Sequence, residues 1–242
     1  MLSGLYSAAT ALTVAQHRHE ATAHNLAHAS VPGYRRITSS TETFESAMSA
    51  VQPAEGRGVL SLPDQTDFTS GPVQTTGRSL DVAIQGDGFF AVSTPDGTAY
   101  TRNGVFFLQP DGALITADGY RVQDSAGAEI QLPATISPSD ITIGNDRSIS
   151  VAGAVVSQLG VFAFEDNSKL ERIGTTLFSP SPEAVQTESF AVVQQGARES
   201  SNVSTVDELI QMIAGMRHYE AAQKVLTSID DSISQSTDPR TA

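Results

Sequence analysis

Histidine is the residue whose type and spacing could most readily do chemistry here, because four of the five histidines lie within the first 28 residues. His24 and His28 are four residues apart and would share one face of a helix, with His17 seven residues before His24. Imidazole nitrogens bind zinc, but the zinc-protease pattern also needs a glutamate beside its first histidine, and Asn25 stands there. No carboxylate completes the set. We therefore interpret these histidines as structural or surface residues and expect no metal and no cofactor, with a metal-dependent cell-wall hydrolase as the alternative.

Aspartate and asparagine residues next to glycine are the second candidate for chemistry, since carboxylate and amide oxygens bind calcium. The pairs are Asp87-Gly88, Asp96-Gly97, Asn103-Gly104, Asp111-Gly112 and Asp118-Gly119. A calcium loop concentrates several such ligands within a few residues, whereas apolar runs separate these pairs. Asp-Gly and Asn-Gly also favour tight hairpin turns, so the spacing predicts a series of β-hairpins.

Other catalytic patterns are absent from the sequence. It contains no cysteine and no G-x-S-x-G motif, and Gly86-Asp87-Gly88 is not followed by the Lys-Ser or Lys-Thr of a phosphate loop. We predict no catalytic residue and a protein that is not an enzyme.

The charge balance excludes two classes of partner. The chain has 27 acidic and 14 basic residues, a formal net charge of −13, and no basic cluster. Phosphate groups of nucleic acids and anionic lipids would repel it.

No run approaches the roughly 18 apolar residues of a membrane span, and the first residues lack the positive region of a signal peptide. We expect no nucleic-acid partner, no membrane insertion and no cleaved signal.

The N-terminal element that must position the histidines is a helix over residues 1–31. A series of mostly apolar or small residues follows steps of three and four, which places the series on one stripe. Its members are Leu2, Leu5, Ala9, Leu12, Gln16, His19, Ala23 and Leu26. Pro32 and Gly33 are expected to end the helix and turn the chain, because the residue before proline avoids the helical conformation and glycine permits the turn.

A second long helix is predicted over residues 201–236, followed by a polar tail over 237–242. Ser204 with Asp207 three residues later is typical of a helix start. The stripe continues at steps of three and four through Met212, Gly215, Tyr219, Ala222, Leu226, Ile229 and Ile233, and Val206, Leu209, Ile213 and Met216 widen it.

Between these helices lie an extended linker over residues 32–71 and a β-domain over 72–200. Short apolar runs separated by the turn pairs indicate antiparallel strands. The predicted fold class is mainly β with α, a central antiparallel β-domain flanked by N- and C-terminal long helices that pair as a coiled coil.

Three motifs carry a resemblance to a known family. Asn25-Leu26-Ala27 with Pro32-Gly33-Tyr34, the run over residues 79–122, and the run over 201–230 resemble the corresponding segments of flagellar basal-body rod and hook proteins. The family usually has asparagine where this chain has His28, and threonine where it has Val31. The three motifs occur in the family's order.

The resemblance implies a structural rod subunit in the basal body, exported through the flagellum-specific type III apparatus and assembled in the periplasm with itself and other rod or hook-type subunits. Gln223 to Val225 is more similar to the proximal-rod branch (FlgF) than to the distal-rod branch (FlgG), which stays the alternative. We expect assembly to depend on Leu5, Leu12, Leu26, Ile213, Tyr219, Leu226 and Ile229. A monomeric carbohydrate- or protein-binding β-module is a further alternative.

Overall fold

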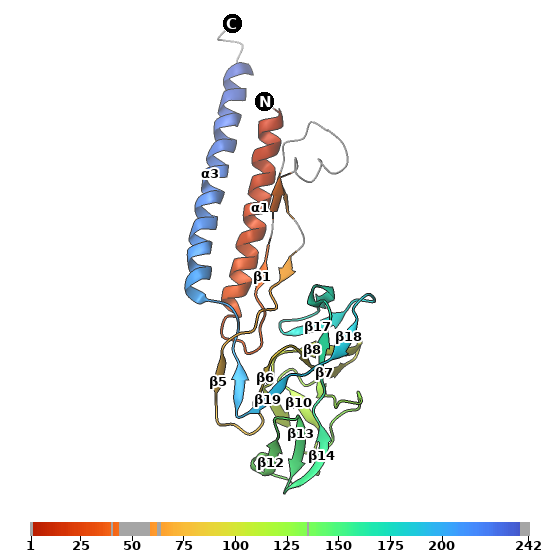
Figure 1. Ribbon diagram of the computed structural model, residues 1–242. Coiled ribbons are helices and arrows are strands. Elements are labelled where there is room, and N and C mark those ends of the chain that lie inside the picture. Colours follow the sequence, from red (N-terminus) through yellow and green to blue (C-terminus); the bar gives the residue numbers. More distant parts are fainter. Residues whose placement is uncertain (1, 40, 44–58, 62–63, 135, 238–242) are drawn as a thin grey trace. The chain divides into compact units, whose positions relative to one another are not determined.

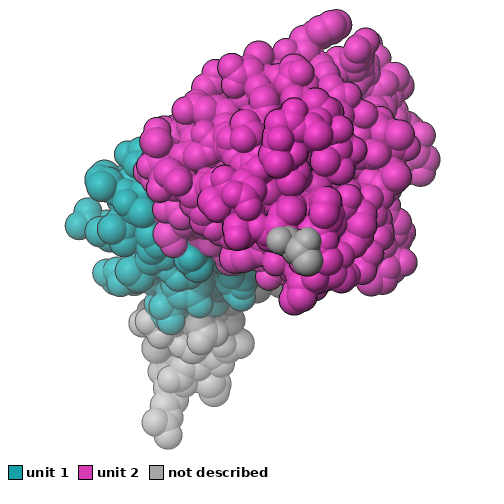
Figure 2. Space-filling model, turned by 90° about the horizontal axis from the view of Figure 1, so that it is seen from below, with its two compact units in different colours: residues 1–27, 37–67, 204–242 teal, residues 28–36, 68–203 magenta. Residues whose placement is uncertain are grey.

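The chain folds into two compact units in the computed structural model (Figures 1 and 2). Unit 1 comprises Met1–Ala27, Ile37–Asp67 and Ser204–Ala242, and unit 2 comprises His28–Arg36 and Phe68–Val203. The structure describes residues 2–39, 41–43, 59–61, 64–134 and 136–237. Its side chains are described over 9–39, 64–134 and 136–228.

Unit 1 contains the two helices and four short strands. Helix α1 spans Leu2–Ala27 and helix α3 spans Thr205–Thr237. The strands are β1 (Ile37–Thr38), β2 (Thr41–Thr43), β3 (Val59–Ser61) and β4 (Gln65–Thr66), paired antiparallel as β1 with β4 and β2 with β3. Helix α1 packs against α3, β1 and β3.

Helix α3 begins where its sequence supplies a cap. The Asp207 amide donates to the Ser204 hydroxyl oxygen at 3.4 Å, and the Glu208 amide donates to the Ser204 carbonyl at 3.0 Å. Asp207 and Glu208 place two acids in the first turn, where the partial positive charge of the helix favours them. Neither helix, within the described residues, holds a stretch long and apolar enough to cross a bilayer.

The predicted fold class was wrong: the chain is mostly a β-rich domain with one N-terminal and one C-terminal helix, without a coiled-coil pairing. A coiled coil buries apolar side chains along both helices. Over residues 205–228 of α3 only Glu208 is buried, and Gly215 and Ala222 are too small to act as knobs.

The buried positions of α1 also differ from the predicted stripe. They are Val14, Ala21, Thr22 and Asn25, whereas the stripe residues Ala9 and Gln16 are exposed. The three-and-four spacing identified an apolar face on each helix, but such a spacing does not determine what covers that face.

Unit 2 is built from antiparallel strands. Its largest sheet has the order β16-β17-β8-β7-β11-β10-β9, and β15 joins it by pairing with both β7 and β18. Three smaller sheets are β12-β13-β14, β19-β6 and β20-β5. The strands are β5 (Val73–Thr75), β6 (Val82–Gln85), β7 (Phe89–Thr94), β8 (Gly97–Thr101), β9 (Phe106–Leu108), β10 (Leu114–Thr116), β11 (Arg121–Val122), β12 (Ile141–Ile143), β13 (Ser148–Val151), β14 (Ala154–Gln158), β15 (Val161–Phe164), β16 (Leu170–Arg172), β17 (Leu177–Pro180), β18 (Gln186–Glu188), β19 (Val192–Gln195) and β20 (Ala197–Glu199).

Strand β7 is central because both of its faces are covered. Phe90 and Val92 belong to one apolar core, whereas Phe89 and Ala91 belong to a second. Successive residues of a strand point to opposite faces, so a continuous apolar run is what a strand between two cores requires. The two short 3₁₀ helices of unit 2 are Pro138–Asp140 and Asn167–Lys169.

Three of the five predicted hairpin turns are present around this sheet. Gly97, Gly112 and Gly119 lie at the turns that join the antiparallel neighbours β7 and β8, β9 and β10, and β10 and β11. Each of the three has a positive φ, between 86° and 126°. The hairpin prediction was wrong for Asp87-Gly88 and Asn103-Gly104, because β6 does not pair with β7 and β8 does not pair with β9.

Replacing Phe90 by alanine should destabilise unit 2 by about 3–5 kcal/mol, because a large aromatic leaves a cavity that the core only partly fills. Phe90 is fully buried and contacts Phe106 edge-on, with ring centroids 5.1 Å apart. Urea denaturation followed by near-ultraviolet circular dichroism measures the change. Phe190→Ala is the matched control: Phe190 is 88% exposed, so its replacement should shift stability by less than about 0.5 kcal/mol.

Candidate assembly interface

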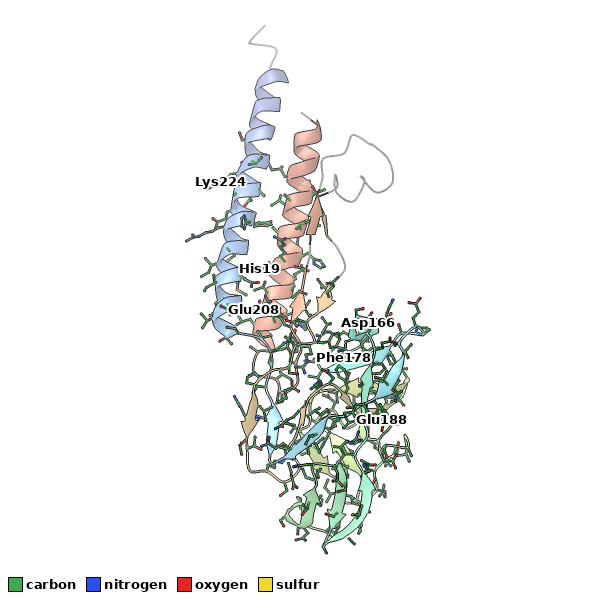
Figure 3. All side chains as sticks on the ribbon, viewed as in Figure 1. His19, Asp166, Phe178, Glu188, Glu208 and Lys224 are labelled. Atoms are coloured by element: carbon green, nitrogen blue, oxygen red, sulfur yellow. The ribbon has the colours of Figure 1, made fainter. Side chains whose placement is uncertain are left out.

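Helix α3 leaves a set of large apolar side chains uncovered. The exposed ones are Val206, Leu209, Ile210, Ile213, Met216, Tyr219 and Val225. Ile213 is 51% exposed and Val206 is 64% exposed. Folded single chains rarely expose contiguous apolar patches unless the patch binds something, so this helix is the candidate interface (Figure 3).

Four of these residues lie on one side of the helix. Val206, Leu209, Ile213 and Met216 follow each other at steps of three, four and three, which at about 100° per residue places them in one stripe. We call this set the apolar stripe of α3.

A separate and less exposed set of positions follows the same steps along α3. Met212, Gly215, Ala222 and Leu226 are half-buried, and they lie about 120° around the helix from the apolar stripe. The sequence had merged both sets into one wide face. The structure separates them into a partly covered side and an open side.

The residues predicted for assembly fall into three groups. Ile213 and Tyr219 are exposed, whereas Leu12, Leu26 and Leu226 are half-buried within unit 1. Leu5 and Ile229 lie in α1 and α3, but their side chains are outside the described residues.

Asn25 is a buried polar residue whose role the sequence did not predict. Its side-chain nitrogen donates to the carbonyl of Ile37 at 2.8 Å, and its side-chain oxygen accepts from the amide of Ile37 at 2.8 Å. One amide thereby replaces the hydrogen bonds of a neighbouring strand and fixes β1 beside the end of α1. A lone asparagine in a helix carries no such signal, because its partner is twelve residues away in sequence.

The histidines are distributed between the two units. In unit 1 the His17 Nδ1 atom lies 3.6 Å from the Asp64 Oδ1 atom. In unit 2 the His28 ring stacks on Tyr34 with centroids 5.2 Å apart. Among the side chains that the structure describes, no three potential ligands come together around a metal position.

The predicted turn after α1 is a buried structure in unit 2. Gly33 has φ +70°, and a β-carbon there would overlap the backbone of Asn103. Only glycine adopts a positive φ readily and also leaves room for the Asn103 backbone. Pro32 before it is half-buried, and Tyr34 and Arg35 after it are fully buried.

Arg35 belongs to a buried ionic cluster within unit 2. Its Nη2 atom donates to Glu199 at 2.6 Å, and Arg102 donates to the other oxygen of that carboxylate at 3.3 Å. Burial lowers the pKa of Arg102 below its ordinary value, and Glu199 partly offsets this by stabilising the charged form. Arg172 donates to the Arg35 carbonyl at 2.6 Å and lies over the Tyr34 ring.

Comparison with known proteins identifies the family of this chain. The model of the flagellar hook protein FlgE/F/G D1 domain matches residues 83–151, and that of the flagellar basal body rod FlgEFG protein C-terminal region matches residues 194–238. The chain is 31% identical to the flagellar basal-body rod protein FlgG of Bacillus subtilis (strain 168), covering 97% of this chain and 98% of the relative. The chain belongs to the flagellar basal-body rod protein family.

Other family members match over nearly as much of the chain. The rod protein FlgF of Rhizobium meliloti (strain 1021) is 30% identical, with 96% of this chain and 95% of the relative covered. The FlgF of Mesorhizobium japonicum is 32% identical over 91% of this chain and 90% of its own length. The resemblance seen in the sequence is confirmed, and the chain is a structural subunit of the flagellar basal-body rod.

The two family matches cover parts of both units. The D1 match lies within unit 2, whereas the C-terminal match begins in unit 2, where it includes β20, and continues through all of α3 in unit 1. The apolar stripe of α3 is therefore part of a region that rod proteins share.

Replacing Asn25 by aspartate should release β1 from the end of α1. The carboxylate keeps the size of the side chain but loses the donor to Ile37, and it would face a carbonyl oxygen at a buried position. The expected cost is about 1–3 kcal/mol. Hydrogen exchange of the Ile37 amide measures it. Gln223→Glu, which adds the same charge at an exposed position of α3, should leave that amide protected.

Proposed function

We propose that this rod subunit assembles with copies of itself and with other rod or hook-type subunits through the helices of unit 1. The apolar stripe of α3 supports this most directly, because it is uncovered within one chain and lies in the region that matches other rod proteins. In this proposal the β-rich unit 2 folds by itself, whereas the helices are completed by neighbours.

Burial of the apolar stripe favours a contact that repeats from one subunit to the next. Burying one leucine or isoleucine contributes roughly 1.5–3 kcal/mol, so a stripe of four apolar residues supplies a substantial part of an interface. When a subunit uses one surface to bind a different surface of the next, the contact repeats without closing and generates a helical assembly. A rod requires this kind of repetition.

The predicted assembly residues take two roles in this proposal. Ile213 and Tyr219 are exposed and would contact neighbouring subunits. Leu12, Leu26 and Leu226 are half-buried and would hold unit 1 in shape for that contact. Leu5 and Ile229 are proposed to extend these contacts along the same helices.

The export route and the position of this subunit in the rod are also proposals. We propose export through the flagellar type III apparatus without a cleaved signal, and a place in the proximal rod. The Gln223 to Val225 pattern supports the proximal place. FlgF and FlgG relatives match at similar identity, so the distal rod is the alternative.

Ile213→Asp should abolish rod assembly, because a charge at the centre of the apolar stripe cannot be buried without a partner. Swimming in soft agar and electron microscopy of basal bodies measure the effect in a strain that carries only this variant. Ala221→Asp introduces the same charge at another exposed position of α3 and should retain motility. Normal rods built from the Ile213 variant would contradict the proposed interface.

Deleting the whole gene should halt growth of the flagellum before the proximal rod is complete. Electron micrographs of basal bodies from the deletion strain would then show an incomplete proximal rod and no distal rod. Basal bodies with a complete proximal rod and no distal rod would instead place this subunit in the distal rod.

A further inference from the structure

The chain passes between unit 1 and unit 2 four times, after Ala27, after Arg36, after Asp67 and after Val203. Any force that travels along the backbone from one unit to the other must pass through these four connections, and the first two bound one short segment of unit 2, residues 28–36. On the side of unit 2 the connecting segments comprise residues 33–36, 69–72 and 199–202. Glu199 and Asn202 each form hydrogen bonds with both of the other segments, and the Ser200 amide also donates to the Pro72 carbonyl at 2.9 Å.

Asn202 joins its own segment to both of the others. Its side-chain oxygen accepts from the Arg36 amide at 2.7 Å. Its side-chain nitrogen donates to the Thr69 carbonyl at 3.0 Å and to the Thr69 hydroxyl at 3.2 Å. An asparagine amide offers both a donor and an acceptor, and both are used here.

Glu199 makes a second set of bonds to the same segments. Its Oε1 atom accepts from Arg35 at 2.6 Å and from the Gly71 amide at 2.9 Å, and its backbone carbonyl accepts from the Gly33 amide at 2.9 Å. The side chains of Glu199 and Arg35 are both fully buried. Charge-assisted bonds of this kind are among the stronger hydrogen bonds in proteins. We call Glu199, Asn202 and their partners Gly33, Arg35, Arg36, Thr69 and Gly71 the junction clasp.

The regular structure beside the clasp is too small to hold these segments alone. Strands β5 and β20 pair over three residues, from Val73 opposite Glu199 to Thr75 opposite Ala197. An isolated two-stranded ribbon is marginal in water. A pull on the chain beyond Val203 would open such a ribbon one pair at a time, starting at Glu199.

The clasp changes how that pull is distributed. A buried ion pair is weak evidence for overall stability, because desolvation offsets much of the attraction, but it does fix one arrangement of its partners. Here the ion pair helps to fix three chain segments near the points where they leave unit 2. Removing the Glu199 charge would take away the carboxylate that both Arg35 and Arg102 contact.

We propose that the junction clasp is a mechanical joint, which makes the three connecting segments of unit 2 share force instead of letting β20 separate from β5. This inference builds on the proposed function, since a rod subunit carries torque. Its test uses the free subunit, so a failure of assembly does not affect the outcome.

Glu199→Gln in the full-length chain tests the local effect. The amide nitrogen of glutamine would oppose a guanidinium, so the Gly33 and Gly71 amides should exchange with solvent at least about tenfold faster by nuclear magnetic resonance. Amides of β7 should exchange at the wild-type rate. Glu188→Gln, the same change at an exposed position of β18, should have no effect (Figure 3).

Asn202→Ala provides an independent variant. It should speed exchange of the Arg36 amide while leaving Gly71 protected by Glu199. If amide exchange becomes equally faster throughout unit 2 in both variants, these residues serve only overall stability. If the exchange rates of the Gly33, Gly71 and Arg36 amides stay unchanged, no clasp exists. Either result overturns the proposal.

A pulling experiment measures the shared force directly. The sequence has no cysteine, so Thr205→Cys and Val155→Cys, both exposed, supply two unique attachment points. With Glu199→Gln added, the first rupture in optical tweezers should occur at a lower force than in the same double-cysteine protein with Glu199, whereas Glu188→Gln should not change it. An unaltered first rupture force with Glu199→Gln would overturn the mechanical role.

Discussion

Helix α3 carries more apolar surface than one subunit covers, and the proposed assembly depends on that excess. Val206, Leu209, Ile213 and Met216 are exposed in a region that other rod proteins share. Exposed aliphatic surface costs free energy in water, and a neighbouring subunit that covers it removes that cost. In this view the subunit is incomplete by itself and becomes complete in the rod.

Different interactions stabilise the two units. Unit 2 has two apolar cores on either side of β7, so its stability comes from burial inside one chain. Among the helix side chains that the structure describes, unit 1 buries Val14, Ala21, Thr22, Asn25 and Glu208, and it includes specific polar contacts such as the Asn25 bonds to Ile37. A unit with little core of its own is suited to gain its remaining contacts from other subunits.

Polar side chains fix the places where the chain must follow one path. Asn25 fixes β1 beside the end of α1, and Glu199 and Asn202 hold together the segments through which the chain leaves unit 2. Apolar contacts tolerate sliding, whereas hydrogen bonds to buried groups require one geometry and are costly to leave unmade. A structural protein that transmits force needs such fixed points where its parts are connected.

The sequence by itself determined the two helices, three of the five predicted hairpin turns and the family, because periodicity, turn chemistry and motif order are properties of neighbouring residues. It located Gly33 as a turn and Ile213 on an apolar face. Tertiary structure alone decided that the helices do not form a coiled coil, that α3 has an open and a partly covered side, and that Asn25, Arg35, Glu199 and Asn202 are partners of distant segments. Arg35 and Glu199 are 164 residues apart, and local patterns do not reveal which buried charge will meet which.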